Sequence, residues 1–86
     1  MREHCDDIVS VLASFTPGPR GRVRVTPHVM KWQGRRWKLT TMGLYHPEPR
    51  GNKRMHIFSF ASGDTAFRLE LDPETLEWRL KEAFYG

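Results

Sequence analysis

The sequence predicts a mainly β protein, in which a short N-terminal helix precedes a bent antiparallel sheet of about five strands, closing as a small barrel or half-barrel. Its 86 residues suit one domain. From residue 22 onward, apolar and polar side chains alternate, which is typical of strands. Three Trp, five Phe and two Tyr supply large apolar side chains for a small core. We divide the single domain 1–86 into a helical segment (1–15), a linker (16–21) and a β core (22–86).

The N-terminal segment has apolar residues at the spacing of a helix face, namely Ile8, Val11, Leu12 and Phe15. Asp6 and Asp7 precede them, and acidic residues favour the start of a helix. We therefore expect a helix over about residues 5–15, although the β-branched residues in it would suit a strand as well. The linker 16–21 holds two prolines and two glycines, which end regular structure.

The first strands change phase along the chain. Val23 and Val25 alternate with arginines, so odd positions point inward, whereas Met30 and Trp32 place even positions inward. One regular strand cannot do both, and a bulge, bend or turn is expected at residues 27–28.

A two-residue turn at Gln33 and Gly34 is the clearest local feature, because Gly34 supplies the positive φ that such hairpins require. This turn sets Trp32 opposite Arg35, and it places a guanidinium within reach of an indole. The inner face of the predicted hairpin then carries Met30, Trp32, Trp37 and Leu39, and its outer face carries Lys31, Arg36 and Lys38.

The second half of the chain is predicted as a polar loop over residues 45–54, a strand over about 55–61, a turn at 62–64, and a strand in which Phe67, Leu69 and Leu71 alternate with polar residues. Asp72 and Pro73 begin either a helix from residue 73 or a type I turn before a closing strand. The alternation of Leu76, Trp78 and Leu80 favours the strand. An α+β fold with a C-terminal helix remains the alternative.

Three motifs resemble a small uncharacterised bacterial domain family with a W-x-G-R-R-aromatic hairpin: residues 32–39, 67–72 and 78–80. The resemblance spans about residues 22–82. It implies an all-β core and no catalytic residue. Some members of the family are associated with accessory proteins of bacterial error-prone DNA synthesis, so the resemblance also implies a role in DNA repair. The chain departs from the family in its proline-bearing segment 45–54 and in Leu76, where a glycine often occurs.

Catalytic and metal sites are not indicated. The four histidines show no ligand spacing, and the sequence has neither a phosphate-binding glycine loop nor a nucleophile elbow. His46, Glu48 and His56 would form an acid–base pair only if folding brought them together. We expect no enzyme, cofactor or metal. The single cysteine, Cys5, excludes an intrachain disulfide, and the stretch 8–15 is too short to span a bilayer, so a cytoplasmic protein is expected.

Charge is the most informative property. The net charge is +4, yet between Ile8 and Pro47 there are seven cations and no acid, while acids predominate after residue 63. We therefore predict a binding surface on the first hairpin, for single-stranded nucleic acid or alternatively for an acidic surface of a protein partner. The family resemblance implies that a nucleic-acid ligand would be met in DNA repair or replication. Trp32 would lie in the core or serve as a stacking platform. The predicted site comprises Arg22, Arg24, Lys31, Trp32, Arg35, Arg36 and Lys38.

Overall fold

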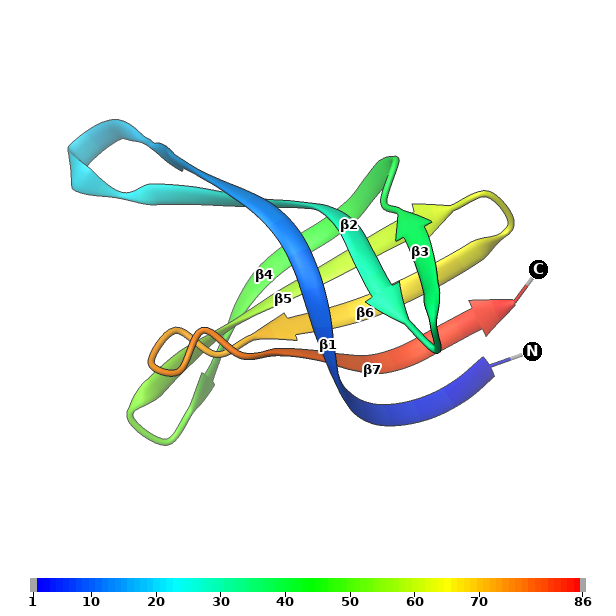
Figure 1. Ribbon diagram of the computed structural model, residues 1–86. Helices are drawn as coiled ribbons and strands as arrows, with labels where there is room; N and C mark the ends of the chain where they lie inside the picture. Colours follow the sequence, from blue (N-terminus) through cyan, green and yellow to red (C-terminus); the bar gives the residue numbers. More distant parts are fainter. Residues whose placement is uncertain (1, 86) are drawn as a thin grey trace.

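The computed structural model describes residues 2–85 as one antiparallel sheet of seven strands (Figure 1). The strands are β1 (Arg2–Pro17), β2 (Val23–Trp32), β3 (Arg35–Lys38), β4 (Thr41–Arg50), β5 (Lys53–Ser62), β6 (Thr65–Leu71) and β7 (Trp78–Tyr85). Their order in the sheet is β3-β2-β1-β7-β6-β5-β4. Met1 and Gly86, the outer bounds of the predicted domain, lie outside the described residues.

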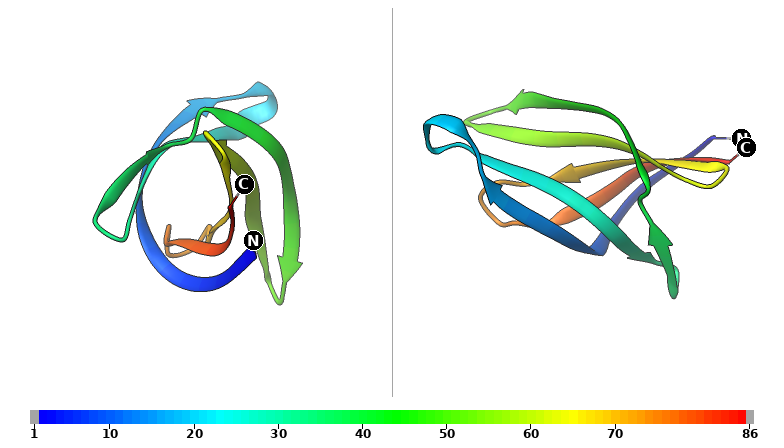
Figure 2. Two further views of the ribbon diagram at one scale, coloured as in Figure 1. Left: turned by 90° about the vertical axis from the view of Figure 1, so that its right-hand side faces the viewer. Right: turned by 90° about the horizontal axis from the view of Figure 1, so that it is seen from above.

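Strand β1 joins the two parts of the sheet. Its N-terminal half pairs with β7, with Arg2 opposite Phe84, and its C-terminal half pairs with β2 from Ser10 to Pro17. The sheet curls strongly, so that its inner face encloses the core, and the first residues of β1 lie beside the last residues of β7 (Figure 2). The outer part of the β1–β2 hairpin, residues 13–27, projects from the rest of the sheet as an arm.

The core lies on the inner face and draws its buried residues from β1, β2, β5, β6 and β7 and from Leu39 directly after β3. Its buried apolar residues, each less than a tenth exposed, are Val9, Met30, Trp32, Leu39, Phe58, Phe60, Phe67, Leu69, Leu71, Trp78, Leu80 and Ala83. Phe67 packs edge-on against both Trp32 and Trp37, with ring centroids 6.1 and 5.1 Å apart. These rings hold the β2–β3 hairpin against the second half of the chain.

The predicted fold class is wrong in its helices and its number of strands. Residues 5–15 lie within β1, and no α-helix occurs among residues 2–85. The helical spacing was produced by side chains that are not buried together: Ile8 is 62% exposed and Leu12 63%, whereas Val9 between them is 8% exposed. The segment therefore alternates as a strand does, with the odd positions inward. No helix in the described range is long and apolar enough to cross a membrane.

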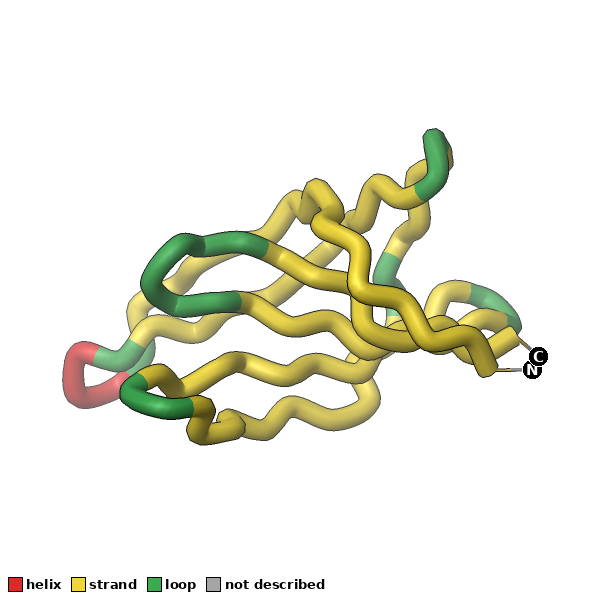
Figure 3. Tube along the Cα trace, turned by 90° about the horizontal axis from the view of Figure 1, so that it is seen from below, coloured by secondary structure: helices red, strands yellow, loops and turns green. Residues whose placement is uncertain are grey.

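The predicted linker is the tip of the arm rather than a connection between separate elements. Residues 16 and 17 belong to β1, and Pro19–Gly21 form a single 3₁₀ turn, the red segment in Figure 3. The N–H of Arg22 donates to the carbonyl oxygen of Pro19 at 3.3 Å, which helps to close the turn.

Two local predictions about β2 and β3 are confirmed. His28 is the extra residue of a bulge, since Leu12 pairs with Val29 and Ala13 pairs with Pro27. The hairpin has the expected register, with Trp32 opposite Arg35, and both turn residues have positive φ, 54° at Gln33 and 70° at Gly34. That geometry is a type I′ turn, whose twist matches that of the flanking strands.

The predicted loop 45–54 is wrong. Residues 41–50 form β4, and only Gly51 and Asn52 remain as the turn to β5. Pro47 and Pro49 misled the interpretation, because proline is rare in a central strand. Strand β4 is an edge strand of the sheet, where proline is tolerated and where it hinders pairing with further chains.

The C-terminal segment is a turn and a strand, so the alternative helix from residue 73 is wrong. The Asp72 carboxylate accepts the backbone N–H groups of Glu74 at 2.8 Å and of Thr75 at 3.3 Å. Leu76 then adopts φ 62°, a conformation that favours glycine, and the chain enters β7 at Trp78. Leu76, where the resembling family often has glycine, is therefore a non-glycine residue in a left-handed backbone conformation.

Candidate nucleic-acid interface

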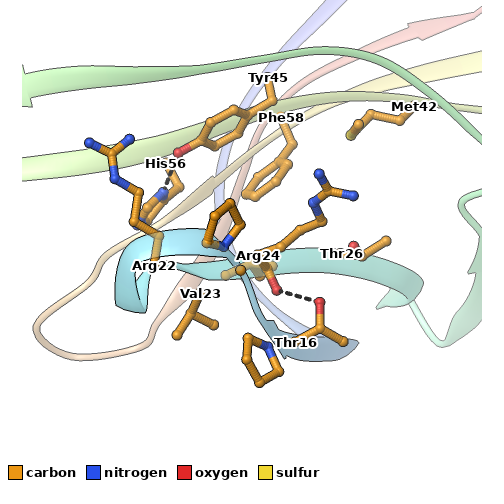
Figure 4. Close-up of a pocket in the computed structure, with 13 residues that line it drawn as sticks. Thr16, Arg22, Val23, Arg24, Thr26, Met42, Tyr45, His56 and Phe58 are labelled. Carbon is orange, nitrogen blue, oxygen red and sulfur yellow. Dashed lines mark hydrogen bonds between the residues drawn. The ribbon is translucent and has the colours of Figure 1, made fainter.

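A groove of about 830 Å³ lies between the arm and strands β4 and β5 (Figure 4). The arm contributes residues on both sides of its tip, including Arg22 and Arg24. The facing strands contribute Met42, Tyr45, His56 and Phe58. None of the described residues that line the groove is acidic. The groove therefore presents cations on one wall and aromatic rings on the other.

Arg22, directly before β2, and Arg24 in β2 point toward the aromatic wall, whereas Val23 points to the opposite side of the arm (Figure 4). Val23 is consequently 58% exposed although its spacing suggested burial. The hairpin twists along its length, so a face that is outward near the body of the sheet is turned toward β4 and β5 at the arm. Neither arginine takes part in an ion pair among the described residues.

The aromatic wall is built in two layers. Phe58 is 1% exposed and packs against Trp78 in the core, with ring centroids 5.7 Å apart. Tyr45 packs on Phe58 at 5.0 Å and is 41% exposed, so part of its ring is open to solvent. Its hydroxyl and the Nδ1 atom of His56 share a hydrogen bond of 2.7 Å, and the two rings stack 5.8 Å apart. Tyr45 is thus a ring held in place on one side and accessible on another.

Burial lowers the pKa of His56 below its ordinary value, because the imidazolium would lose solvation there. A neutral imidazole is therefore favoured at pH 7. The positive charge of the groove then comes from Arg22 and Arg24, with Arg20 exposed at the tip of the arm.

The cations of the β2–β3 hairpin form a second surface. Lys31 pairs with Arg36 across the strands, and Lys38 pairs with Val29, so all three cations share the outer face. Lys31 lies seven positions beyond Arg24 along β2, which corresponds to about 23 Å of extended chain. The structure therefore divides the predicted site into an arm part and a hairpin part. Arg35 belongs to neither, because its guanidinium lies over the Trp37 ring at 4.1 Å.

Trp32 is part of the core. It is 5% exposed, and its indole N–H donates to the Asp7 carboxylate at 2.9 Å. The edge-on contact with Phe67 covers its ring. Of the two roles considered for this residue, the structure gives the buried one, and the ring offers no face for stacking.

Six of the ten acidic residues form ion pairs, all with partners outside the first hairpin. Arg50 donates to Glu70 at 2.8 Å and also to Glu48, and Lys53 donates to Asp72 at 2.7 Å. The hydrogen bond from Lys53 is the main cause that lowers the pKa of Asp72. Asp6 pairs with Arg79 and Lys81. Among residues 2–85, no ion pair uses any of the seven cations between Ile8 and Pro47, so these charges are not neutralised within the molecule.

His46, Glu48 and His56 do not converge. His56 lies opposite Pro47, whereas His46 and Glu48 lie opposite Ile57 and Met55, so alternation places His56 on the other face of β4 and β5. No group of three or more His, Cys, Asp or Glu side chains that could hold a metal ion occurs within the described part of the chain.

The aromatic half of the groove was missed because residues 45–54 were interpreted as a loop. In the strand, Tyr45 lies opposite Phe58, and Met42 lies opposite Phe60, so both face the inner side of the sheet. Their spacing of three residues is out of phase for a regular strand, and only the bulge between Met42 and Tyr45, which the structure reveals, places both on one face. No family model matches this chain, and no curated protein or solved structure is similar enough to be matched to it.

Proposed function

We propose that this protein is a non-enzymatic module that binds single-stranded nucleic acid in the groove between the arm and strands β4 and β5. The observation that carries the proposal is the composition of the groove. Arg22 and Arg24, which form no ion pair, line one wall, the half-exposed Tyr45 lines the other, and no described lining residue is acidic. Single-strand binding proteins combine these two parts, cations that track phosphates and aromatic rings that stack on bases.

The arginine side of the groove suits the backbone of the ligand. Guanidinium groups bind phosphate in a bidentate manner, and neither Arg22 nor Arg24 has a competing carboxylate. Together with Arg20, the arm offers three cations. If these three neutralise three phosphates, the affinity falls with salt at a log–log slope of about −2.

The tyrosine side suits a base. Tyr45 is fixed from behind by Phe58 and His56, so little side-chain entropy is lost when a base stacks on its open part. Stacking on an aromatic ring is worth about 1–3 kcal/mol per base and tolerates any sequence. A base splayed from a single strand reaches the ring, whereas a base inside a duplex does not.

We infer a DNA repair or replication setting from the resemblance of residues 22–82 to the bacterial domain family. Some members of that family are associated with accessory proteins of error-prone DNA synthesis. Single-stranded DNA is a substrate of repair and replication, so the proposed ligand and this setting agree.

The test is a fluorescence anisotropy titration of a labelled oligothymidylate of about 12 nucleotides, at about 50 and 200 mM salt. Arg22→Glu/Arg24→Glu is expected to weaken binding by at least about thirtyfold at the lower salt, because two attractive charges become repulsive. Tyr45→Ala is expected to weaken it by about tenfold, within the range measured for lost stacking.

Two matched controls separate the groove from general charge. Tyr45→Phe keeps the ring and removes only the hydroxyl, so its affinity stays within about threefold of wild type. Lys31→Glu/Arg36→Glu/Lys38→Glu changes the net charge more than the arm variant does but leaves the groove intact. Equal loss in the arm and hairpin variants, or an affinity that does not respond to salt, contradicts the proposed site.

A further inference from the structure

Two exposed aliphatic side chains lie on the outer face of β1. Ile8 and Leu12 are 62% and 63% exposed, and both point away from the core because the inward positions of β1 are odd. They are four residues apart on one strand, or about 13 Å. Val29 lies beside Leu12 on β2 and extends the strip.

Unpaired cations border this strip on one side. Ser10 lies between the two aliphatic residues and opposite Lys31, Lys31 lies opposite Arg36, and Val29 lies opposite Lys38. Cross-strand partners share a face, so the aliphatic strip and the three cations form one continuous surface. We call it the outer face, defined as Ile8, Leu12, Val29, Lys31, Arg36 and Lys38.

We propose that the outer face docks an acidic, amphipathic segment of a partner protein. The apolar side of such a segment covers Ile8 and Leu12, and its carboxylates meet the three cations. Charge complementarity supports this occupant, since none of the three cations has a carboxylate partner within residues 2–85. The proposal concerns a different surface from the groove and does not depend on nucleic-acid binding.

Other occupants fit the outer face less well. A second copy of the chain would bring the same three cations together across a two-fold axis, which costs energy. A membrane-binding face usually carries Trp or Phe, and the outer face has neither. A nucleic acid would find phosphate partners here but no exposed aromatic ring for its bases.

The probe is a synthetic peptide of about 18 residues with leucine on one helical face and glutamate on the other. Isothermal titration with the full chain is expected to give a dissociation constant of about 10–100 μM. A peptide of the same composition, rearranged so that leucine and glutamate no longer segregate, is expected to bind at least tenfold more weakly. No binding of the first peptide at about 1 mM, or equal binding of both, overturns the proposal.

Variants of the chain locate the contact. Ile8→Thr/Leu12→Thr places β-branched, strand-favouring threonine at both exposed positions, so the fold is retained and is checked by thermal unfolding. This variant and Lys31→Glu/Arg36→Glu/Lys38→Glu are each expected to weaken peptide binding at least tenfold. The groove variant Arg22→Glu/Arg24→Glu is expected to bind the peptide within about twofold of wild type. Loss of binding in the groove variant alone overturns the assignment.

Two further measurements identify a different occupant. Sedimentation velocity is expected to show a monomer at all concentrations used, and a dimer that Leu12→Thr abolishes assigns the face to a second copy instead. Vesicles of phosphatidylcholine and phosphatidylserine are expected not to bind. Binding to them that Ile8→Thr/Leu12→Thr removes assigns the face to a membrane surface and overturns the proposal.

Discussion

The indole of Trp32 donates a hydrogen bond to the carboxylate of Asp7 at 2.9 Å. The two residues lie on neighbouring strands, β2 and β1, and are separated by 25 positions in the sequence. A buried indole N–H needs an acceptor, and an acid from the neighbouring strand supplies it. This bond anchors the turn end of the β2–β3 hairpin to β1.

Replacement of Trp32 by Phe is expected to lower the free energy of unfolding by about 1–2 kcal/mol, because the hydrogen bond and part of the buried ring are lost. Affinity for the oligonucleotide should stay within about twofold, since the ring does not line the groove. Urea unfolding and the anisotropy titration measure the two quantities. Asp7→Asn retains an acceptor and is the control. A loss of nucleic-acid binding without a loss of stability would restore Trp32 as a binding residue.

Glu70 is a buried acid whose partner is half exposed. Its side chain is 5% exposed, and Arg50 contacts both carboxylate oxygens, at 2.8 and 3.4 Å. Hydrogen bonds to Glu70 and then to Glu48 raise the pKa of Arg50 above its ordinary value. Arg50→Met leaves the Glu70 carboxylate without its main partner and is expected to cost about 2–3 kcal/mol in urea unfolding.

The double variant Arg50→Met/Glu70→Leu removes both charges. It is expected to recover most of the loss, to within about 1 kcal/mol of wild type, because apolar residues of similar size replace buried ion pairs at little cost. If Arg50→Met and the double variant are equally unstable, the packing of the arginine stem matters more than the charge pair.

Leu76 is predicted to be replaceable by glycine with a gain in stability. Its φ of 62° disfavours a residue with a Cβ atom, and its side chain is 61% exposed, so little packing is lost. Leu76→Gly is expected to raise the free energy of unfolding by about 0.5–1 kcal/mol. Glu74→Gly, at an ordinary φ in the same turn, should lower it by a similar amount. A loss at both positions would show that Leu76 makes a stabilising contact.

The stability of the protein is expected to decrease between about pH 7 and pH 5 because of His56. The pKa of His56 is lowered in the folded state, so the unfolded chain binds the proton first as the pH falls. The free energy of unfolding therefore decreases until the pH lies below the pKa of His56 in the folded protein. Urea unfolding of His56→Gln should show a flatter dependence over this interval. Identical pH dependence in the two proteins would mean that another group is responsible.

The parts of the fold that the sequence predicted are those determined by neighbouring residues. The Gln33 and Gly34 turn fixes its own register, and two out-of-phase alternations require a bulge wherever they meet, here at His28. The strand with Phe67, Leu69 and Leu71 was clear because one of its faces is wholly apolar. These features need no knowledge of the rest of the chain.

The errors came from residues whose role depends on distant partners. Ile8 and Leu12 lie outside the core, so their spacing imitated a helix face, and Pro47 indicated a loop because nothing local shows that its strand lies at an edge. The site was predicted in part: Arg22 and Arg24 were found from charge, but their separation from Lys31 follows from the twist of the arm, and Tyr45 joins them only through the tertiary fold.

The position of β1 between β2 and β7 has a topological consequence. Every other pair of adjacent strands is consecutive in the chain, so β1 and β7 form the single long-range pairing of the described sheet. Because Arg2 lies opposite Phe84, a short linker can join the two ends, and new termini can be opened between Leu39 and Thr40. The permuted chain would run β4-β5-β6-β7-β1-β2-β3, a plain meander in which every strand pairs with its predecessor. Its contact order falls, and stopped-flow refolding is expected to be faster than that of the natural order.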